Sequence, residues 1–213
     1  MPLLVNFGAG LIISYLIGSL PTAYIAGRLY KGIDIRLYGS GNVGTTNAFR
    51  MLGRGPGLVV FIIDILKGVL PTVLVADVLG LDKVLYRVFL GVTAVVGHNW
   101  TVFLRFKGGK GIATSLGLLI GLTIKIESIR LVLGACFLVW VVVFVMTGFV
   151  SLASLITAAV LPILMLVSSQ SFELVSLGVV ICFFVFLRHR SNIKRLLAGQ
   201  ESKVIFFSDK RGK

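Results

Sequence analysis

Long runs of hydrophobic residues alternate with short polar segments along the 213-residue chain. We interpret seven of these runs as membrane-crossing helices, because several of them approach the roughly 20 residues that span a bilayer core. The third, fourth and seventh runs are short for a full span, which tilt, local thinning of the bilayer or an inward-dipping loop could accommodate. A re-entrant pair is disfavoured, because it would place Arg105, Lys107 and Lys110 at membrane depth. A β-barrel is excluded, because runs such as LVWVVVFVM do not alternate. The predicted helices are Leu3–Ala26, Gly57–Leu79, Leu85–Val96, Ile112–Ile124, Leu131–Met146, Ser151–Val167 and Leu174–Leu187.

The overall composition also favours a membrane protein. Hydrophobic residues make up 57% of the chain, the mean hydropathy is +1.02, and only 14% of residues are charged, against roughly 25% in globular proteins. We therefore predict an all-α, polytopic membrane protein with a single domain over residues 1–213. The first charged residue is Arg28, so the first apolar run lacks the basic start of a signal peptide. We expect that run to remain as a helix with its N-terminus outside.

Basic residues concentrate on one predicted side of the membrane. Seven crossings place segments 28–55, 105–110, 147–150 and 188–213 together, with 16 basic and 3 acidic residues, whereas the opposite loops hold four of each. The positive-inside rule makes the basic side, and the C-terminus with it, cytoplasmic. A nucleic-acid patch is a poor explanation of the net charge of +13, because the charge is divided among loops and no binding module is recognisable.

Three polar segments rich in Gly, Asn and basic residues fall on this cytoplasmic side: Gly39–Arg50, Gly97–Gly111 and Arg188–Glu201. Neither a bilayer crossing nor an apolar core requires such segments. A basic site assembled from three loops at one membrane face indicates chemistry on an anionic, phosphorylated substrate.

The first polar segment predicts an anion site at the beginning of a short helix. Its glycines allow a tight turn that directs N–H groups toward an anion, and the residues from Thr45 onward predict a helix that ends near Gly53. The hydroxyl of Ser40 and the guanidinium of Arg50 could bind phosphate oxygens directly. A flexible cytoplasmic loop is the alternative. The candidate phosphate ligands are Ser40, Asn42, Thr46, Asn47 and Arg50.

The second polar segment ends in Lys107, Gly108, Gly109, Lys110 and Gly111, directly before the fourth apolar run. That predicted helix begins at the cytoplasmic face, so its free N–H groups and positive dipole end point at the same loops. We expect these five residues to bind phosphate. The Walker pattern fails, because Gly rather than Ser or Thr follows Lys110, and an ATPase is therefore disfavoured. The alternative is that the basic residues only anchor the loop at the membrane surface.

The third polar segment contains His189 and Asn192, which share a helix face. His189 is a candidate base or hydrogen-bond donor, and Asn192 a candidate donor to a developing oxyanion. The apolar residues that follow could place this helix along the membrane surface, and two polar residues on an interfacial helix are the alternative.

Other polar positions favour structural roles. Asp64 and Lys67 share a face of the second apolar run, and we expect a buried pair that serves helix packing, although intramembrane charge leaves a functional role open. His98 and Asn99 are expected to make ordinary hydrogen bonds at a helix end. No set of His, Cys and carboxylate residues has metal-ligand spacing, so we expect neither a metal nor a cofactor. Nothing in the sequence indicates an oligomeric state.

Taken together, the motifs resemble the acyl-phosphate-dependent glycerol-3-phosphate acyltransferases of bacterial membranes, the PlsY family. The resemblance runs almost from end to end, through GSLPTAYIAGR, GSGNVGTTNAFR, DILKG, GHNWTVFLRFKGGKGIATS and HRSNIKRLLAGQE. It implies seven transmembrane helices in the bacterial inner membrane, with the active site facing the cytoplasm. It also implies transfer of a fatty acyl group from acyl phosphate to the 1-hydroxyl of glycerol 3-phosphate, which gives lysophosphatidic acid and inorganic phosphate.

The resemblance implies residue roles as well. Ser40 and Arg50 match catalytic and phosphate-contacting positions of the family. Lys110 and the glycines around it match its glycerol-phosphate loop, and His189 and Asn192 match residues needed for activity. Ser40, His189 and Asn192 are therefore the predicted catalytic residues.

Three further positions complete the comparison with the family pattern. Glu201 matches a structural glutamate. The chain departs from the pattern at Thr45, where the family often has Ala, and at Thr101, where Pro is common. Both changes are small.

The chemistry of the polar segments agrees with this resemblance. An acyl phosphate carries a good leaving group, so the protein needs mainly to hold two phosphates and direct a hydroxyl at the carbonyl. The acyltransferase motif of His followed five positions on by Asp is absent, because Phe103 and Lys194 occupy those positions. A phosphatase or lipid phosphotransferase, a transporter of a phosphorylated solute and a non-catalytic scaffold are the alternatives. A transporter predicts repeated halves and polar groups near the bilayer midplane, which the sequence does not show.

Overall fold

The structure is a computed structural model that describes residues 2–203. Helices and turns account for those residues and no strand occurs among them, which confirms the all-α class. Residues 204–213 of the predicted cytoplasmic tail lie outside the described part of the chain.

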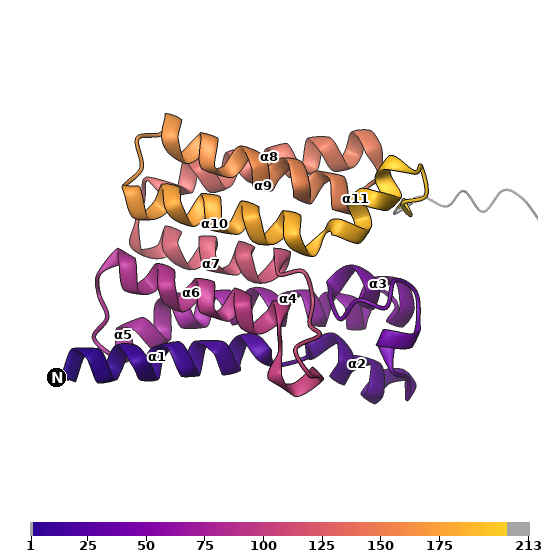
Figure 1. The fold of residues 1–213 in the computed structure, drawn as a ribbon, viewed down its shortest axis with the longest axis horizontal. Helices are drawn as coiled ribbons and strands as arrows, with labels where there is room; N and C mark the ends of the chain where they lie inside the picture. Colours follow the sequence, from indigo (N-terminus) through magenta and orange to yellow (C-terminus); the bar gives the residue numbers. More distant parts are fainter. Residues whose placement is uncertain (1, 204–213) are drawn as a thin grey trace, which may run out of the picture.

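Eleven α-helices follow one another along the described chain, with three short helical turns between them (Figure 1). The turns η1 (Ile35–Leu37) and η3 (Val102–Leu104) are 3₁₀-helices, and η2 (Pro71–Val75) is a π-helical stretch that joins α4 to α5. The α-helices are α1 (Pro2–Ser19), α2 (Thr22–Lys31), α3 (Thr45–Leu52), α4 (Arg54–Leu70), α5 (Ala76–Val78), α6 (Val84–Asn99), α7 (Ile112–Lys125), α8 (Ile129–Thr147), α9 (Val150–Val167), α10 (Phe172–Arg188) and α11 (Arg190–Leu197).

Each of the seven predicted apolar runs is helical, although the first two are each divided among more than one helical element. The helices differ in their capacity to span a membrane. Five stretches are long and apolar enough by length and composition. The pair α10 and α11, bent by 63°, would form a sixth, and α7 is shorter. The five stretches are Pro2–Lys31, Arg54–Val78, Val84–Leu104, Ile129–Thr147 and Val150–Val167.

We expected one continuous helix over Leu3–Ala26, but the helix is interrupted at Leu20 and Pro21. Proline has no N–H group and its ring clashes with the preceding turn of a helix, so α1 ends and α2 begins around it. The Leu20 carbonyl accepts a hydrogen bond from Nζ of Lys67 at 2.6 Å. The break is thus stabilised by the charged side chain of α4.

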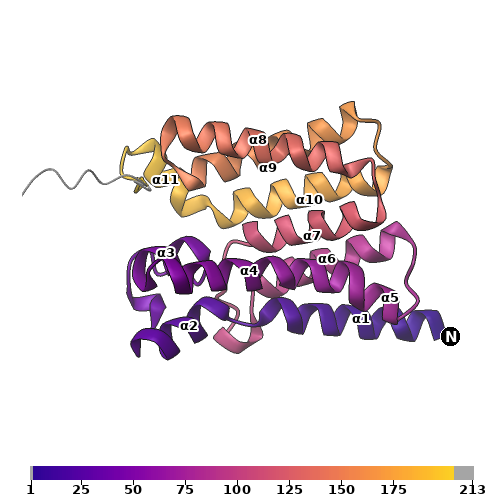
Figure 2. The same ribbon diagram turned by 180° about the vertical axis from the view of Figure 1, so that it is seen from behind.

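The polar segments gather at one end of the bundle. In Figure 1 the longer helices run side by side along the long axis, and α2, α3 and α11 lie at the end opposite the N-terminus. Figure 2, from behind, shows the same grouping. The α6–α7 loop joins them through Lys110, whose Nζ donates to Oδ1 of Asn192 on α11. The expectation that the three polar segments share one end is therefore confirmed.

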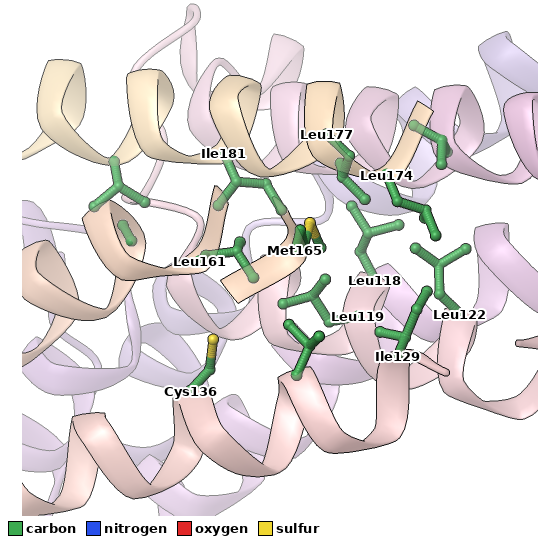
Figure 3. Close-up of a cluster of buried hydrophobic side chains, with 14 of the residues drawn as sticks. Leu118, Leu119, Leu122, Ile129, Cys136, Leu161, Met165, Leu174, Leu177 and Ile181 are labelled. Carbon is green, nitrogen blue, oxygen red and sulfur yellow. The ribbon is translucent and has the colours of Figure 1, made fainter. Parts of the chain in front are cut away.

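The largest apolar cluster lies around α7, which packs against α8, α9 and α10. Figure 3 shows side chains from the four helices meeting in it, among them Leu118, Met165 and Leu177, which are almost fully buried. On the other side of α7, a Cβ on Gly117 would lie 1.9 Å from the Ile65 carbonyl oxygen of α4, so the two backbones touch. Small residues permit such close packing where lipid provides no hydrophobic drive for helix association.

Candidate functional site

The first and third polar segments line a cavity of about 340 Å³, near the lower end of the volumes usual for ligand pockets. Arg50 and Arg195 give the cavity a positive character, and Nη2 of Arg50 donates to the Ser202 carbonyl at 3.0 Å. A small anion is the ligand that this lining favours. The lining residues are Gly39, Ser40, Arg50, Arg195, Glu201 and Ser202.

Asn47 organises the loop that presents Ser40 to this cavity. Its side chain is buried, Oδ1 accepts from the Ser40 N–H at 3.0 Å, and Nδ2 donates to the carbonyls of Ile35 and Tyr38 at 3.3 and 3.1 Å. The side-chain amide of Asn47, which we expected to contact phosphate, is thus used for hydrogen bonds within the protein.

The start of α3 forms the inner side of the same loop. Gly44 precedes this helix and gives it no side-chain cap, and an uncapped helix N-terminus can bind an anion. Asn42 and Thr46 are half-buried beside it, and the Asn42 N–H donates to Oγ of Ser40 at 3.4 Å. The predicted helix at Thr45 is confirmed, and it ends before Gly53 as expected.

The double glycine of the second segment is bonded on both sides by the protein itself. The N–H of Gly109 donates to the His98 carbonyl at 2.9 Å, and that of Gly108 donates to the Asn99 carbonyl at 3.2 Å. Their two carbonyls accept from the Arg188 guanidinium. We expected both glycines to bind phosphate, but in this structure their N–H groups are hydrogen-bonded within the protein. The glycines instead permit close packing. A Cβ on Gly108 would lie 2.0 Å from the His98 carbonyl oxygen.

Lys110 connects the second segment to the third. Its ammonium donates to Oδ1 of Asn192, whose Nδ2 donates to Oε1 of Glu201 at 2.6 Å. The pKa of Lys110 is lowered to about 8, mainly by burial; Glu201 opposes this shift and the neighbouring arginines contribute to it. The residue therefore combines a cation with a partly desolvated position, which strengthens its attraction for a phosphate.

Glu201 is held by hydrogen bonds from three side chains, which connect the end of the described chain to α9 and α11. Besides Asn192, Oγ of Ser151 donates to it at 2.8 Å and Nε of Arg195 at 2.7 Å. Burial alone would raise the pKa of Glu201, but these hydrogen bonds outweigh it and hold the pKa below its ordinary value.

His189 lies at the bend between α10 and α11, with its side chain almost fully buried. Its Nδ1 lies 2.8 Å from the Val185 carbonyl oxygen. Because a carbonyl can only accept, Nδ1 carries the proton and Nε2 of the neutral ring remains an acceptor. Asn192 is buried as well. Both predicted catalytic residues of this segment are therefore buried near the bend.

The remaining predicted ligands lie at the edge of the site. Lys107 is exposed, and no other described residue hydrogen-bonds to its side chain. Gly111 precedes α7 in a left-handed conformation, with φ of 78°, and gives that helix no side-chain cap. Within residues 2–203 no group of three or more His, Cys, Asp and Glu side chains could hold a metal ion.

Asp64 and Lys67 form the expected buried pair, with 2.6 Å between Oδ1 and Nζ, but the pair also reaches the site. Oγ1 of Thr22 donates to Asp64 at 2.6 Å, and Oγ1 of Thr45, the first residue of α3, donates at 3.2 Å. Nδ1 of His98 lies 3.7 Å from the same carboxylate. The pair thus connects the start of α3 with the end of α6.

Three site residues have roles that sequence reasoning did not assign: Arg188, Arg195 and Ser151. Arg195 follows Asn192 by three positions, which is the helical spacing that could have indicated a shared face. Ser151 is the first residue of a predicted apolar helix, and no neighbouring residue in the sequence indicates a contact with Glu201. Arg188 precedes His189 directly, where the positive-inside rule already explains a basic residue.

Known proteins are similar to this chain in sequence and fold. Residues 9–199 match a family model described as glycerol-3-phosphate acyltransferase. A glycerol-3-phosphate acyltransferase of Synechococcus sp. (strain CC9902) is 45% identical over 194 residues, which cover 91% of this chain and 93% of the relative. Glycerol-3-phosphate acyltransferase 2 of Moorella thermoacetica is 45% identical, with 91% and 95% covered.

Two crystal structures share the fold. Both are of PlsY (YgiH), an integral membrane glycerol 3-phosphate acyltransferase, and both are 36% identical to this chain. The glycerol 3-phosphate form has a TM-score of 0.84 and the comparison covers 93% of this chain and 96% of the other. The lysophosphatidic acid form has a TM-score of 0.81, with 93% and 95% covered.

Proposed function

The chain belongs to the glycerol-3-phosphate acyltransferase family, and we propose that it transfers a fatty acyl group from acyl phosphate to the 1-hydroxyl of sn-glycerol 3-phosphate. The products are lysophosphatidic acid and inorganic phosphate. The observation that carries the proposal is the convergence of three basic, glycine-rich segments on one end of a bundle of apolar helices, joined by the contacts of Lys110 with Asn192 and of Asn192 with Glu201.

The two phosphates would be held by different segments. Ser40 and Arg50 line the cavity and would bind one phosphate, with the uncapped first N–H groups of α3 as further donors. Lys110 would bind the phosphate of the acceptor at the start of α7, with Lys107 at the entrance. Two adjacent anion sites place the acceptor hydroxyl beside the acyl carbonyl, which is the main requirement for this reaction.

The reaction needs one bond to form and one to break. The hydroxyl oxygen of glycerol 3-phosphate attacks the carbonyl carbon, and the bond from that carbon to the phosphate oxygen breaks, so that phosphate leaves with the electron pair. Asn192 uses one N–H of Nδ2 for Glu201 and retains a second N–H for the developing oxyanion. The hydroxyl proton has two acceptors within this scheme, Nε2 of His189 and the phosphate of the substrate itself.

We further propose that the chain crosses a bacterial inner membrane seven times, with the N-terminus outside and the site facing the cytoplasm. The acyl chain would lie among the apolar helices. Single cysteines at Ser202 and at Asp82, in a chain whose Cys136 and Cys182 are replaced by Ser, test this orientation. Impermeant thiol reagents added to intact cells should label only the Asp82 position, and labelling of the Ser202 position would contradict it.

The donor is tested with purified protein in a lipidic medium. Radiolabelled glycerol 3-phosphate is offered with acyl phosphate or with acyl-CoA in separate reactions. We expect lysophosphatidic acid only with acyl phosphate, because the loops between the described helices are short and provide no domain for an adenine nucleotide. Product from acyl-CoA alone would require another mechanism on the same fold.

A further inference from the structure

The Arg188 side chain is held against the double glycine of the second polar segment. Its Nε donates to the Gly109 carbonyl at 3.1 Å, and its Nη2 donates to the carbonyls of Gly108 and Gly109 at 3.0 and 2.9 Å. The guanidinium carbon also lies 5.4 Å from the centroid of the Trp100 ring. Three hydrogen bonds and a ring contact fix the plane of this group.

The opposite edge of the glycine pair is fixed as well. The two N–H groups donate to carbonyls at the end of α6, and a Cβ on Gly109 would lie 2.1 Å from Nε2 of His98. The peptide that precedes Lys110 therefore lies between the end of α6 and the end of α10. Lys110 is the next residue along the chain, so its backbone position depends on both contacts.

We propose that Arg188 is a positioning residue for the acceptor site, which holds the glycine pair so that the Lys110 ammonium faces the phosphate of glycerol 3-phosphate. The inference rests on the proposed function. Arg188 does not line the cavity, and its Nε and Nη2 are occupied by the loop. It acts on the substrate through Lys110, not by contact.

Charge and shape both make arginine necessary at this position. The planar fork donates to two neighbouring carbonyls at once, whereas the single ammonium of lysine is a point charge on a flexible stem. Lysine would therefore keep the positive charge and lose the double contact. Arg190 provides a matched control, because it is exposed and belongs to the same segment. Among residues 2–203 its side chain hydrogen-bonds only to the Leu187 carbonyl of the preceding turn, at 3.1 Å.

The test measures binding of glycerol 3-phosphate by calorimetry on the full chain in a lipidic medium, without turnover. Arg188→Gln and Arg188→Lys should each weaken binding about tenfold or more, and Arg190→Gln should leave it within about twofold of the wild type. Thermal midpoints report whether each variant is folded. Arg188→Lys is the milder change and keeps the test valid if the glutamine variant does not fold.

A double-mutant cycle separates positioning from general destabilisation. If Arg188 acts through Lys110, adding Arg188→Gln to Lys110→Gln should cost little further affinity, because the ammonium is already gone. Full additivity of the two effects would overturn the inference, as would wild-type affinity in Arg188→Lys. Absence of binding by the wild type would overturn the proposed function and this inference together, whereas failure of the Arg188 variants to weaken binding would overturn the inference alone.

Discussion

Replacing Lys110 by Gln should be among the most damaging single changes in the site. The ammonium is half-buried and hydrogen-bonded to Asn192, so it needs no reordering to meet a phosphate. A hydrogen bond to a charged group contributes about 1.5–3 kcal/mol, which at about 1.4 kcal/mol per factor of ten corresponds to a loss of roughly 10- to 150-fold in kcat/KM for glycerol 3-phosphate.

The protonation state of Lys110 should also make kcat/KM for glycerol 3-phosphate depend on pH. Lys110 has a pKa of about 8, so its ammonium is charged below that pH and neutral above it. Acceptor kcat/KM should therefore fall as the pH rises through about 8. Lys110→Arg keeps its charge throughout this range and should lose this alkaline limb, as should Lys110→Gln at its lower activity.

The assay is steady-state acylation of labelled glycerol 3-phosphate at saturating acyl phosphate, between pH 6 and 10. Arg105→Gln is the matched control, since Arg105 is an exposed basic residue of the same loop. If Lys110→Gln is folded and retains wild-type acceptor kcat/KM with the same alkaline limb, the ammonium does not bind the acceptor phosphate.

Three further predictions concern neighbouring residues. Gly109→Ala places a Cβ 2.1 Å from Nε2 of His98 and should raise the Michaelis constant for glycerol 3-phosphate; Gly134→Ala, with nothing within 4 Å of its Cβ, should not. Equal Michaelis constants would contradict this. His189→Gln should lower kcat and remove the acidic limb of the pH–rate profile if His189 is the base; a retained limb would assign the proton to the substrate phosphate. Glu201→Gln should weaken hydrogen bonds worth about 1.5–3 kcal/mol each and lower the thermal midpoint, and an unchanged midpoint would argue against a structural role.

The positions of the helices could be predicted from sequence because apolar runs are a strong local signal in membrane proteins. The residues at which the helices begin and end were harder to predict. The residues on both sides of Pro21 are apolar, so Leu3–Ala26 read as one run, although proline interrupts the helix at that point. In α6 the polar residues His98 and Asn99 continue the helix beyond the predicted Val96, because the end of an apolar run is not the end of a helix.

The sequence indicated which residues belong to the candidate site, but it did not indicate which of them contact one another. The basic and glycine-rich segments, the helix at Thr45 and the pairing of His189 with Asn192 on one face follow from local spacing. The bonds between Arg188 and the double glycine join residues 79 and 80 positions apart. Only packing brings them together, and the positive-inside rule gave Arg188 a sufficient explanation without a partner.

The proposed site transfers the acyl group of acyl phosphate to glycerol 3-phosphate. This transfer is tested most directly by following inorganic phosphate and lysophosphatidic acid in the same reaction with purified protein. We expect both to appear at equal rates, one for one, and phosphate release to require glycerol 3-phosphate. Phosphate released at the same rate without the acceptor, or without lysophosphatidic acid, would contradict acyl transfer and indicate a phosphatase instead.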